Sequence, residues 1–346
     1  MKVVAVANQK GGVGKSTTAA NVAVSLAQYG CRVLSVDWDS QIGLTDCLGI
    51  PDDDGHPSVL AVLADPPEPL RKSIQSTKYP NLDHVAAHID LAHAEFNLIM
   101  HWAERPSMDL LGESLASVAP AYDVAIVDCP PSFSALTLMA LKCADTVLIP
   151  VQCNFHSLRG VDRSLSIIEQ LLNRTGMDAH ILRTMVRTNT RVNRIASERL
   201  IEMFGNAVLP TAIKHTVGFD ESVLARLPYV IFDPLGDAAE AYRAVALEVA
   251  NRADVKSPGT RRTQEIDATP RPGQNPVRGD AVWIVPATLP DLADPRFAAF
   301  CRTAFSAGGH YSAWTDPAGY IFGDEAKAED FVKRINGERV DALRGM

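Results

Sequence analysis

Short, continuous apolar runs alternate with longer stretches of helical periodicity between Lys2 and Arg252. The runs lack the strict apolar–polar alternation of a half-exposed strand, so they predict strands that are covered on both faces. Strands are expected at Lys2–Ala7, Arg32–Val36, Leu82–Ala86, Asp123–Asp128, Thr146–Pro150, Ile181–Val186 and Val230–Phe232. Helices are expected at Ser16–Tyr29, Met108–Val118, Ser134–Lys142, Gly160–Arg174, Val192–Phe204 and Gly236–Arg252. The alternation predicts an α/β fold with a doubly wound, mostly parallel sheet, in which ligands bind at the carboxyl ends of the strands.

The pattern changes at Val255. Residues 255–280 contain four prolines and five basic side chains but few apolar ones, which predicts a linker. The remaining residues predict strands and helices in the order β-α-β-β-α-β, at Ala281–Val285, Phe297–Ser306, His310–Trp314, Gly319–Phe322, Glu325–Ile335 and Arg339–Leu343. Asp316-Pro317-Ala318 is the turn signal of the hairpin in this series. We therefore expect a large domain at 1–254, a linker at 255–280 and a small α+β domain, with a ferredoxin-like fold, at 281–346.

The composition is that of a folded globular protein. Of 346 residues, 47% are hydrophobic and 21% are charged, and the net charge is −8. This acidic balance argues against a basic coat protein for nucleic acid, although it leaves room for a local basic patch. The six cysteines form no C-x-x-C pair, which argues against zinc and thioredoxin-type chemistry. The chain shows no signal peptide and no apolar run of the roughly 18 residues that a membrane span needs, so we expect a cytoplasmic protein without a stable membrane anchor.

A glycine-rich stretch follows the first predicted strand and opens the first predicted helix. Its backbone N–H groups and the positive end of the helix can approach phosphate oxygens closely, which is typical of a P-loop NTPase domain. In this pattern Lys15 reaches the β- and γ-phosphates of a nucleotide, and the Ser16 hydroxyl binds Mg²⁺. The predicted ATP-binding residues are Lys10, Gly11, Gly12, Val13, Gly14, Lys15, Ser16 and Thr17.

Three aspartates follow predicted strands at one edge of the sheet. Asp37 and Asp39 come directly after the second strand, and Asp128 ends the fourth, before Cys129-Pro130-Pro131. An apolar strand that ends in Asp is the Walker B arrangement, in which the carboxylate holds a Mg²⁺ water from a rigid position. Two carboxylates at a spacing of two also suit Mg²⁺ and water. The alternative for Asp37 and Asp39 is an Asx turn that caps the following helix.

The stretch K-G-G-V-G-K-S-T closely resembles the deviant Walker A loop of the ParA/MinD family, and D-W-D-S-Q and D-C-P-P-S resemble two further segments of that family. The resemblance covers residues 1–252. It implies a homodimer that forms around ATP and Mg²⁺, in which Lys10 crosses to the ATP of the partner; the alternative is a solvated lysine in a monomeric P-loop. It also implies that Asp39 positions the attacking water and that Asp37 supports the metal shell. The implied catalytic residues are Lys10, Lys15 and Asp39, and the implied metal ligands are Ser16, Asp37, Asp39 and Asp128.

The same resemblance implies a slow ATPase that binds DNA without sequence preference and is stimulated by a ParB-like activating protein. Basic side chains concentrate between Arg183 and Arg199, and phosphate contacts need such local charge. The predicted DNA-binding residues are Arg187, Arg191, Arg194 and Lys214. The alternative is a solvated helix face. The chain departs from the family at Ser40 and Ile42-Gly43. It also departs at Gly218, where members often carry a DNA-contacting arginine. The stretch Lys214–Gly218 matches a family segment that lies near adenine.

The sequence leaves four functions open. The first is partition of plasmid or chromosomal DNA by a nucleoid-associated ATPase, which the arginines favour. The second is positioning of a protein cargo, for which Gly218 and the small C-terminal domain, expected to dock a partner or cargo, leave room. The third is a MinD-like membrane-cycling regulator, but the acids of Glu325–Ile335 would repel anionic lipid. The fourth is a metabolic enzyme on the same fold, such as an amide-forming ligase or an iron–sulfur reductase.

Overall fold

The computed structural model describes residues 1–51, 57–64, 66–101, 108–132, 134–153, 178–187, 191–255, 277–279, 282–286, 309–312 and 319–322. The chain divides into two compact units, one formed by Met1–Val230 with Leu235–Arg261 and the other by Ile231–Pro234 with Arg262–Met346. The described residues form two separate sheets, with eight and four strands. The three expected parts, 1–254, 255–280 and 281–346, stay a prediction.

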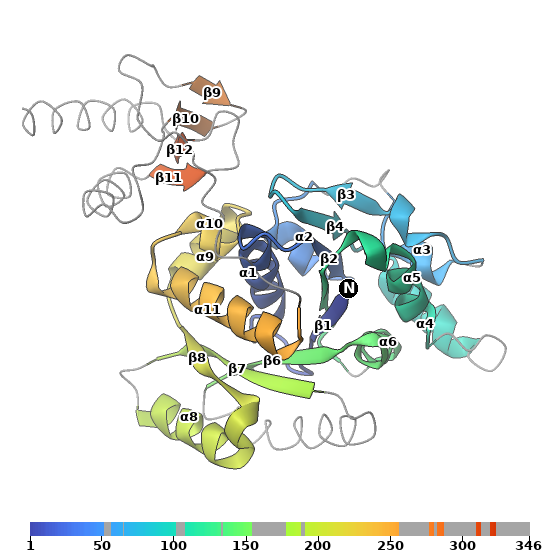
Figure 1. The fold of residues 1–346 in the computed structure, drawn as a ribbon, viewed down its shortest axis with the longest axis horizontal. Helices are drawn as coiled ribbons and strands as arrows, with labels where there is room; N and C mark the ends of the chain where they lie inside the picture. Colours follow the sequence, from blue (N-terminus) through green and yellow to red (C-terminus); the bar gives the residue numbers. More distant parts are fainter. Residues whose placement is uncertain are drawn as a thin grey trace, which may run out of the picture. The chain divides into compact units, whose positions relative to one another are not determined.

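The larger unit is built on the eight-stranded sheet, in the order β3-β4-β2-β5-β1-β6-β7-β8 (Figure 1). All neighbouring strands are parallel except β3 and β4. The strands are β1 (Lys2–Val6), β2 (Val33–Asp37), β3 (Ile74–Ser76), β4 (Leu82–Val85), β5 (Val124–Asp128), β6 (Thr146–Gln152), β7 (Asp178–Val186) and β8 (Val208–Lys214). The central strands β2 and β5 are buried at every position, which explains their continuous apolar runs. The predicted doubly wound, mostly parallel sheet is confirmed.

Helices cover both faces of this sheet (Figure 1). Helices α1 (Lys15–Gln28) and α11 (Asp237–Arg252) pack against each other on one face. Helices α4 (Leu91–Met100), α5 (Leu110–Val118) and α6 (Ala135–Cys143) lie on the other, where Val3 and Ala5 of β1 join a core with Leu111 and Met139. The shorter described helices are α2 (Gly43–Cys47), α3 (Leu60–Leu63), α9 (Gly218–Leu224) and α10 (Tyr229–Phe232); α8 (Arg191–Phe204) follows β7. Within the described ranges, none of the helices has the length and apolar character needed to cross a bilayer.

The elements differ from the predicted ones in several places. The apolar run Val230–Phe232 is not a strand but part of helix α10, which is held where the Val230 N–H donates to Asn21 Oδ1 (2.8 Å). Strands β3 and β8 and helix α4 were not predicted. Strand β8 contains Pro210, which an edge strand tolerates because one of its sides makes no ladder hydrogen bonds. The predicted helix Gly160–Arg174 lies outside the described residues.

The smaller unit contains a four-stranded antiparallel sheet in the order β11-β12-β10-β9. Its strands are β9 (Val277–Gly279), β10 (Val282–Pro286), β11 (Gly309–Ser312) and β12 (Gly319–Phe322). The predicted hairpin is formed by β11 and β12, and β12 lies between β10 and β11. The ferredoxin-like fold stays a prediction. Strand β9 comes from residues that were predicted as linker, and it pairs with β10. The predicted elements Phe297–Ser306, Glu325–Ile335 and Arg339–Leu343 lie outside the described residues.

Candidate functional site

The glycine-rich loop connects β1 to α1 at the carboxyl end of the parallel strands. Gly12 and Gly14 have φ values of +69° and +85°, in the left-handed region that glycine adopts without steric cost. Asn8 Nδ2 donates to the Pro150 carbonyl at 2.7 Å, and Thr184 Oγ1 donates to the Val13 carbonyl at 2.9 Å. These bonds tie the loop to β6 and β7. The loop is therefore held as a rigid cradle whose N–H groups can meet an anion.

Lys15 is the first residue of α1, and only 7% of it is exposed. Burial lowers its pKa, while attraction to the carboxylates of Asp128 and Asp39 opposes this shift. The cation is thus held between a phosphate-binding loop and two acidic side chains. Such a placement suits a group that neutralises phosphate charge in a site from which water is largely excluded.

Asp37 and Asp128 lie directly opposite each other at the carboxyl ends of β2 and β5, and both are fully buried. Burial raises the pKa of Asp37 to about 6, despite its hydrogen bonds from Thr45. Burial and the nearby Asp37 also raise the pKa of Asp128 well above its ordinary value, although the Ser16 hydroxyl and Lys15 oppose this. Two carboxylates placed side by side in a buried position repel each other unless they share a proton or meet a cation.

The oxygens around this pair fit a magnesium ion. Both carboxylate oxygens of Asp128 are buried without a hydrogen-bond partner of normal geometry among the described residues. Such an orphaned acceptor is costly unless it meets a cation or bound water. The Ser16 hydroxyl lies close enough to influence Asp128. Carboxylate, hydroxyl and phosphate oxygens are the ligands that Mg²⁺ prefers, so Ser16, Asp37 and Asp128 together can hold it.

The loop after β2 folds over Ser16. Asp39 is 7% exposed, and its Oδ1 accepts a hydrogen bond from Gln41 N at 3.0 Å. Ile42 has a φ of +60°, which is rare for a β-branched residue and stores strain beside the site. A Cβ at Gly43 would lie 2.7 Å from Ser16 Oγ. Ile42 thus adopts the left-handed turn at a steric cost, and the missing side chain at Gly43 leaves space for the Ser16 hydroxyl.

Lys10 lies on the surface of the same loop. Its N–H donates to Asn8 Oδ1 at 2.9 Å, and its ammonium donates to Gln152 Oε1 at 3.4 Å. The side chain is exposed and lies at the carboxyl end of β6. Unlike Lys15, it is therefore a cation that a second molecule can reach.

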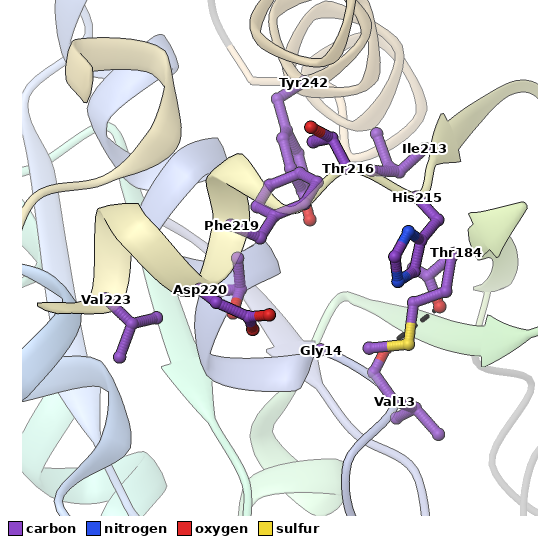
Figure 2. A pocket seen from close by; sticks show the side chains of 12 residues that line it. Val13, Gly14, Thr184, Ile213, His215, Thr216, Phe219, Asp220, Val223 and Tyr242 are labelled. Atoms are coloured by element: carbon purple, nitrogen blue, oxygen red, sulfur yellow. Dashed lines mark hydrogen bonds between the residues drawn. The ribbon is translucent and has the colours of Figure 1, made fainter. Parts of the chain in front are cut away.

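A pocket of about 150 Å³ continues from the phosphate loop. Val13, Gly14 and Thr17 line one side of it. The rest comes from β7, β8 and the segment that follows it, α9 and α11. Figure 2 shows His215 and Asp220 on facing sides of this pocket. Phe219 is fixed by rings on both sides, since its centroid lies 4.3 Å from that of Tyr229 and 6.0 Å from that of Tyr242. A flat, mostly apolar group attached to a phosphate chain on the loop fits here.

Some of the pocket residues come from the segment that was matched to the adenine region, and others do not. The stretch Lys214–Gly218, matched to a segment near adenine, does contribute His215 and Thr216 to the pocket. Phe219, Asp220 and Tyr242 were not predicted, because no local motif marks them. Their helices bring them to the loop only through packing of the whole unit.

The predicted DNA-binding residues lie at the carboxyl ends of β7 and β8, the edge that also carries the phosphate loop. Arg187 follows β7, Arg191 and Arg194 lie in the first turn of α8, and Lys214 ends β8; all four are exposed. Lys214 pairs with Asp237 at 3.0 Å, and Arg194 pairs loosely with Glu198 at 3.9 Å. The edge is thus basic but partly neutralised.

Arg183 and Gly218 lie near this edge, and their surroundings limit what each can contribute to DNA binding. Arg183, counted in the basic segment, is turned inward and donates to Ser197 Oγ (2.8 Å) and to the carbonyls of Leu209 (3.0 Å) and Pro210 (2.6 Å). It therefore joins β7, α8 and β8 and is not a surface cation. A Cβ at Gly218 would lie 3.1 Å from the ring of Tyr229, so a side chain there would press against that ring.

A family model described as an AAA domain matches residues 1–181. The chain is 36% identical to the sporulation initiation inhibitor protein Soj of Bacillus subtilis over 252 residues, which are 72% of this chain and 98% of that protein. It is 33% identical to the chromosome partitioning protein ParA of Myxococcus xanthus over 264 residues, which are 75% of this chain and 92% of that protein.

Solved structures show the same fold. A structure called cobyrinic acid a,c-diamide synthase from Mycobacterium smegmatis, with an ATP analogue and magnesium, is 32% identical. Its TM-score is 0.62, and the match covers 75% of this chain and 99% of that one. The septum site-determining protein MinD of Pyrococcus horikoshii, with Mg-ADP, is 22% identical with a TM-score of 0.59, covering 74% of this chain and 98% of that one.

Proposed function

The chain belongs to the ParA/MinD family of partition ATPases, and from this premise we propose that it distributes or positions DNA by holding duplex DNA, without sequence preference, as an ATP-bound dimer. Its cofactors are ATP and Mg²⁺, and it hydrolyses ATP as a positioning ATPase. The proposal further includes slow turnover alone, stimulation by a ParB-like partner and association with the nucleoid. The names of the partitioning relatives support the choice of DNA as the cargo.

The observation that carries the proposed site is the buried pair Asp37 and Asp128 beside Lys15. Lys15 would bind the β- and γ-phosphates, with the N–H groups of Gly11–Thr17 around them. Ser16 and Asp128 would hold Mg²⁺ and its water, and Asp37 would support that shell. Bound there, Mg²⁺ neutralises charge on the terminal phosphates. Asp39 would orient the attacking water from the loop above Ser16. The base would enter the pocket of His215 and Asp220.

Lys10 supplies the link between ATP and the dimer. Its exposed ammonium at the sheet edge can enter the site of a second copy, where it would offset charge that develops on the terminal phosphoryl group, as an arginine finger does. ATP would then lie between two subunits, and hydrolysis would remove the group that joins them.

The basic edge offers the DNA contacts. Arg187, Arg191, Arg194 and Lys214 lie on the same sheet edge as the phosphate loop, so a dimer formed around ATP would bring two such edges into one assembly. Each edge alone carries a few partly paired cations, and doubling them raises the number of phosphates neutralised. This would make DNA binding depend on ATP.

Retention of random duplex DNA, measured across a salt series with and without ATP, tests this proposal. Asp39→Ala should hold ATP without turnover and bind DNA with an affinity that falls steeply with salt. Lys15→Ala should bind no nucleotide and no DNA. The double variant Arg191→Ala and Arg194→Ala should weaken binding and reduce the salt slope by about 2 per subunit. Arg71→Ala removes an exposed arginine of the turn Leu70–Lys72 and should leave binding unchanged. DNA retention that is equal with and without ATP would contradict the proposal.

The second candidate is an ATPase that positions a protein cargo, and Gly218 favours it. The chain has glycine at 218, where the family resemblance implies a DNA-contacting arginine, so that cation is absent from the basic edge. A Cβ at this position would lie 3.1 Å from the ring of Tyr229. In the same experiment, ATP-dependent dimerisation without DNA retention would select this candidate. Retention on anionic liposomes in place of DNA would select a membrane-cycling regulator instead.

A further inference from the structure

A chain of buried polar side chains lies behind Asp37, away from the glycine-rich loop. Ser35 and Asp37 lie on β2, and His84 lies on β4, where it pairs in register with Ser35. Thr45 comes from α2. Ser35, His84 and Asp37 are 0% exposed, and Thr45 is 2% exposed. Apolar side chains would fill this space at lower cost, so a polar chain here requires an explanation.

The distances form one continuous path. Ser35 Oγ lies 2.9 Å from His84 Nδ1, and His84 Nε2 lies 3.0 Å from Thr45 Oγ1. Thr45 Oγ1 then donates to Asp37 Oδ2 at 2.8 Å, and Thr45 N donates to the same oxygen at 2.8 Å. The four side chains therefore connect two strands and a helix to the acidic pair.

The direction of each bond follows from the chemistry of the groups. Thr45 Oγ1 donates to Asp37 Oδ2, so its single hydroxyl hydrogen is used in this bond. Thr45 Oγ1 must then accept from His84, which places the hydrogen on Nε2. Burial lowers the pKa of His84 to about 3, so the ring is neutral and carries one N–H. Nδ1 is consequently an acceptor. The Ser35 hydroxyl also lies 3.2 Å from the Asp83 carbonyl, and it directs its single hydrogen to Nδ1 at the shorter distance of 2.9 Å.

The path ends at the loop that carries Asp39. With Oδ2 fixed by Thr45, Asp37 presents Oδ1 to Asp39 N, which lies 3.3 Å away. The orientation of the Asp37 carboxylate therefore sets both its approach to Asp128 and the start of the loop over Ser16. Groups that hold metal ligands in place commonly change activity about 10- to 100-fold when they are removed.

We propose that His84 is a positioning residue for ATP hydrolysis: its Nε2–H orients Thr45, which orients Asp37 and the loop of Asp39. The proposal rests on the proposed roles of Asp37 and Asp39. It predicts a defect in turnover and in the Mg²⁺ requirement, with nucleotide binding preserved, because the described hydrogen bonds of this path involve neither Lys15 nor the backbone N–H groups of the phosphate loop. A histidine that only fills the core would change stability without this selectivity.

Two matched substitutions of His84 distinguish the contribution of Nε2 from that of Nδ1. In His84→Gln the amide nitrogen takes the place of Nε2 and can still donate to Thr45, whereas in His84→Asn the amide group reaches only the place of Nδ1. We measure kcat, KM and Mg²⁺ activation after confirming that the wild type turns over ATP. His84→Leu and His84→Asn should lower kcat about tenfold, with KM for ATP within about twofold. His84→Gln should recover most of the activity. Rescue by Asn equal to that by Gln, or unchanged kcat in His84→Leu, overturns the proposal.

A double-mutant cycle tests whether His84 acts through Thr45. Thr45→Val removes the hydroxyl at nearly constant volume, and His84→Leu should then cause no further loss of kcat. Independent, additive losses would contradict the relay. The tautomer of His84 in the wild type gives a readout that needs no turnover: long-range ¹H–¹⁵N spectra, assigned with His84→Gln, should show hydrogen on Nε2. Hydrogen on Nδ1 overturns the proposal. A wild type that lacks ATP hydrolysis overturns the proposed function instead, and the tautomer then decides the direction of the relay.

Discussion

At the scale of single residues, the absence of a side chain at Gly43 matters for the site as much as the side chains that are present. Gly43 has no side chain, and a Cβ there would lie 2.7 Å from Ser16 Oγ, well inside van der Waals contact. Ser16 is the only described hydroxyl that influences Asp128. Residue 43 therefore controls whether the hydroxyl can stay in place for the metal.

Gly43→Ala should weaken Mg²⁺ binding about tenfold, because the new methyl group displaces the Ser16 hydroxyl while the phosphate loop is unchanged. Calorimetric titration of a non-hydrolysable ATP analogue at increasing Mg²⁺ measures this. Ser16→Ala sets the size of the loss when the hydroxyl is absent. Adding Gly43→Ala to Ser16→Ala should have little effect, and a full additional loss would show that Gly43 acts elsewhere.

His84 gives a pH dependence of stability whose sign can be worked out. Its folded-state pKa is lowered to about 3, below the unfolded value of about 6.5, so the unfolded chain binds the proton first as pH falls. Without nucleotide or metal, the wild type should lose stability relative to His84→Leu by about 1.4 kcal/mol per pH unit between pH 6 and pH 5. Urea unfolding at each pH measures the difference. Parallel pH profiles for the two proteins would show that His84 is not buried as a neutral ring.

At the scale of elements, Arg183 looks like a surface charge in the sequence, but its side chain connects β7 to α8 and β8. One guanidinium binds the side chain of Ser197 on α8 and the carbonyls of Leu209 and Pro210 on β8. Strand β8 is an edge strand with an irregular register against β7. The guanidinium therefore holds the stretch around Pro210, where the register is irregular, to β7 and α8.

Arg183→Met keeps most of the side-chain volume but removes these hydrogen bonds. It should lower the free energy of unfolding by about 1–3 kcal/mol, because three acceptors lose their donor. Arg199→Met, on the exposed face of α8, is the matched control and should change stability by less than about 0.5 kcal/mol. Urea unfolding of both variants makes the comparison. Equal effects would mean that Arg183 contributes no more than a surface arginine.

The elements also show what a sequence can predict. Strands β1, β2 and β5 and the loop before Lys15 were predictable, because burial on both faces and phosphate binding leave local patterns. The run Val230–Phe232 was misread, since short apolar runs do not distinguish strand from helix. His84 carried no signal at all, although it lies next to Ser35 on the neighbouring strand. Its role arises from pairing between distant segments, and the same holds for Phe219 and Asp220 in the pocket.

At the scale of the whole molecule, the chain extends beyond the part that matches its relatives. The match to Soj covers 98% of that protein but 72% of this chain. A main core cluster of the larger unit runs from Val3 to Val208, and α11 ends at Arg252 against α1. These observations support our proposal that residues 1–254 form an independent ATPase domain.

A chain that ends at Val255 should therefore fold and hydrolyse ATP at a rate within about twofold of the full chain, since the described site residues all precede that point. Circular dichroism and steady-state turnover of both proteins measure this. A second truncation after Phe232, which removes α11 and with it Tyr242 of the pocket, is the control and should not fold. Aggregation of the longer truncation would show that the boundary is placed too early.

The last prediction concerns the proposed dimer. Lys10 would act on the ATP of a second copy, so its role would appear only when two copies meet. Lys10→Ala should leave ATP affinity of the single subunit within about twofold, since Lys15 and the loop N–H groups remain, yet reduce ATP-dependent dimerisation about tenfold or more. Analytical ultracentrifugation in the Asp39→Ala background, where ATP is not consumed, separates the two effects. Lys72→Ala removes an exposed lysine paired with Glu68 and serves as the control. If Lys10→Ala dimerises like its parent, then the ammonium beside Gln152 is only a surface charge, and ATP must join the subunits through other groups.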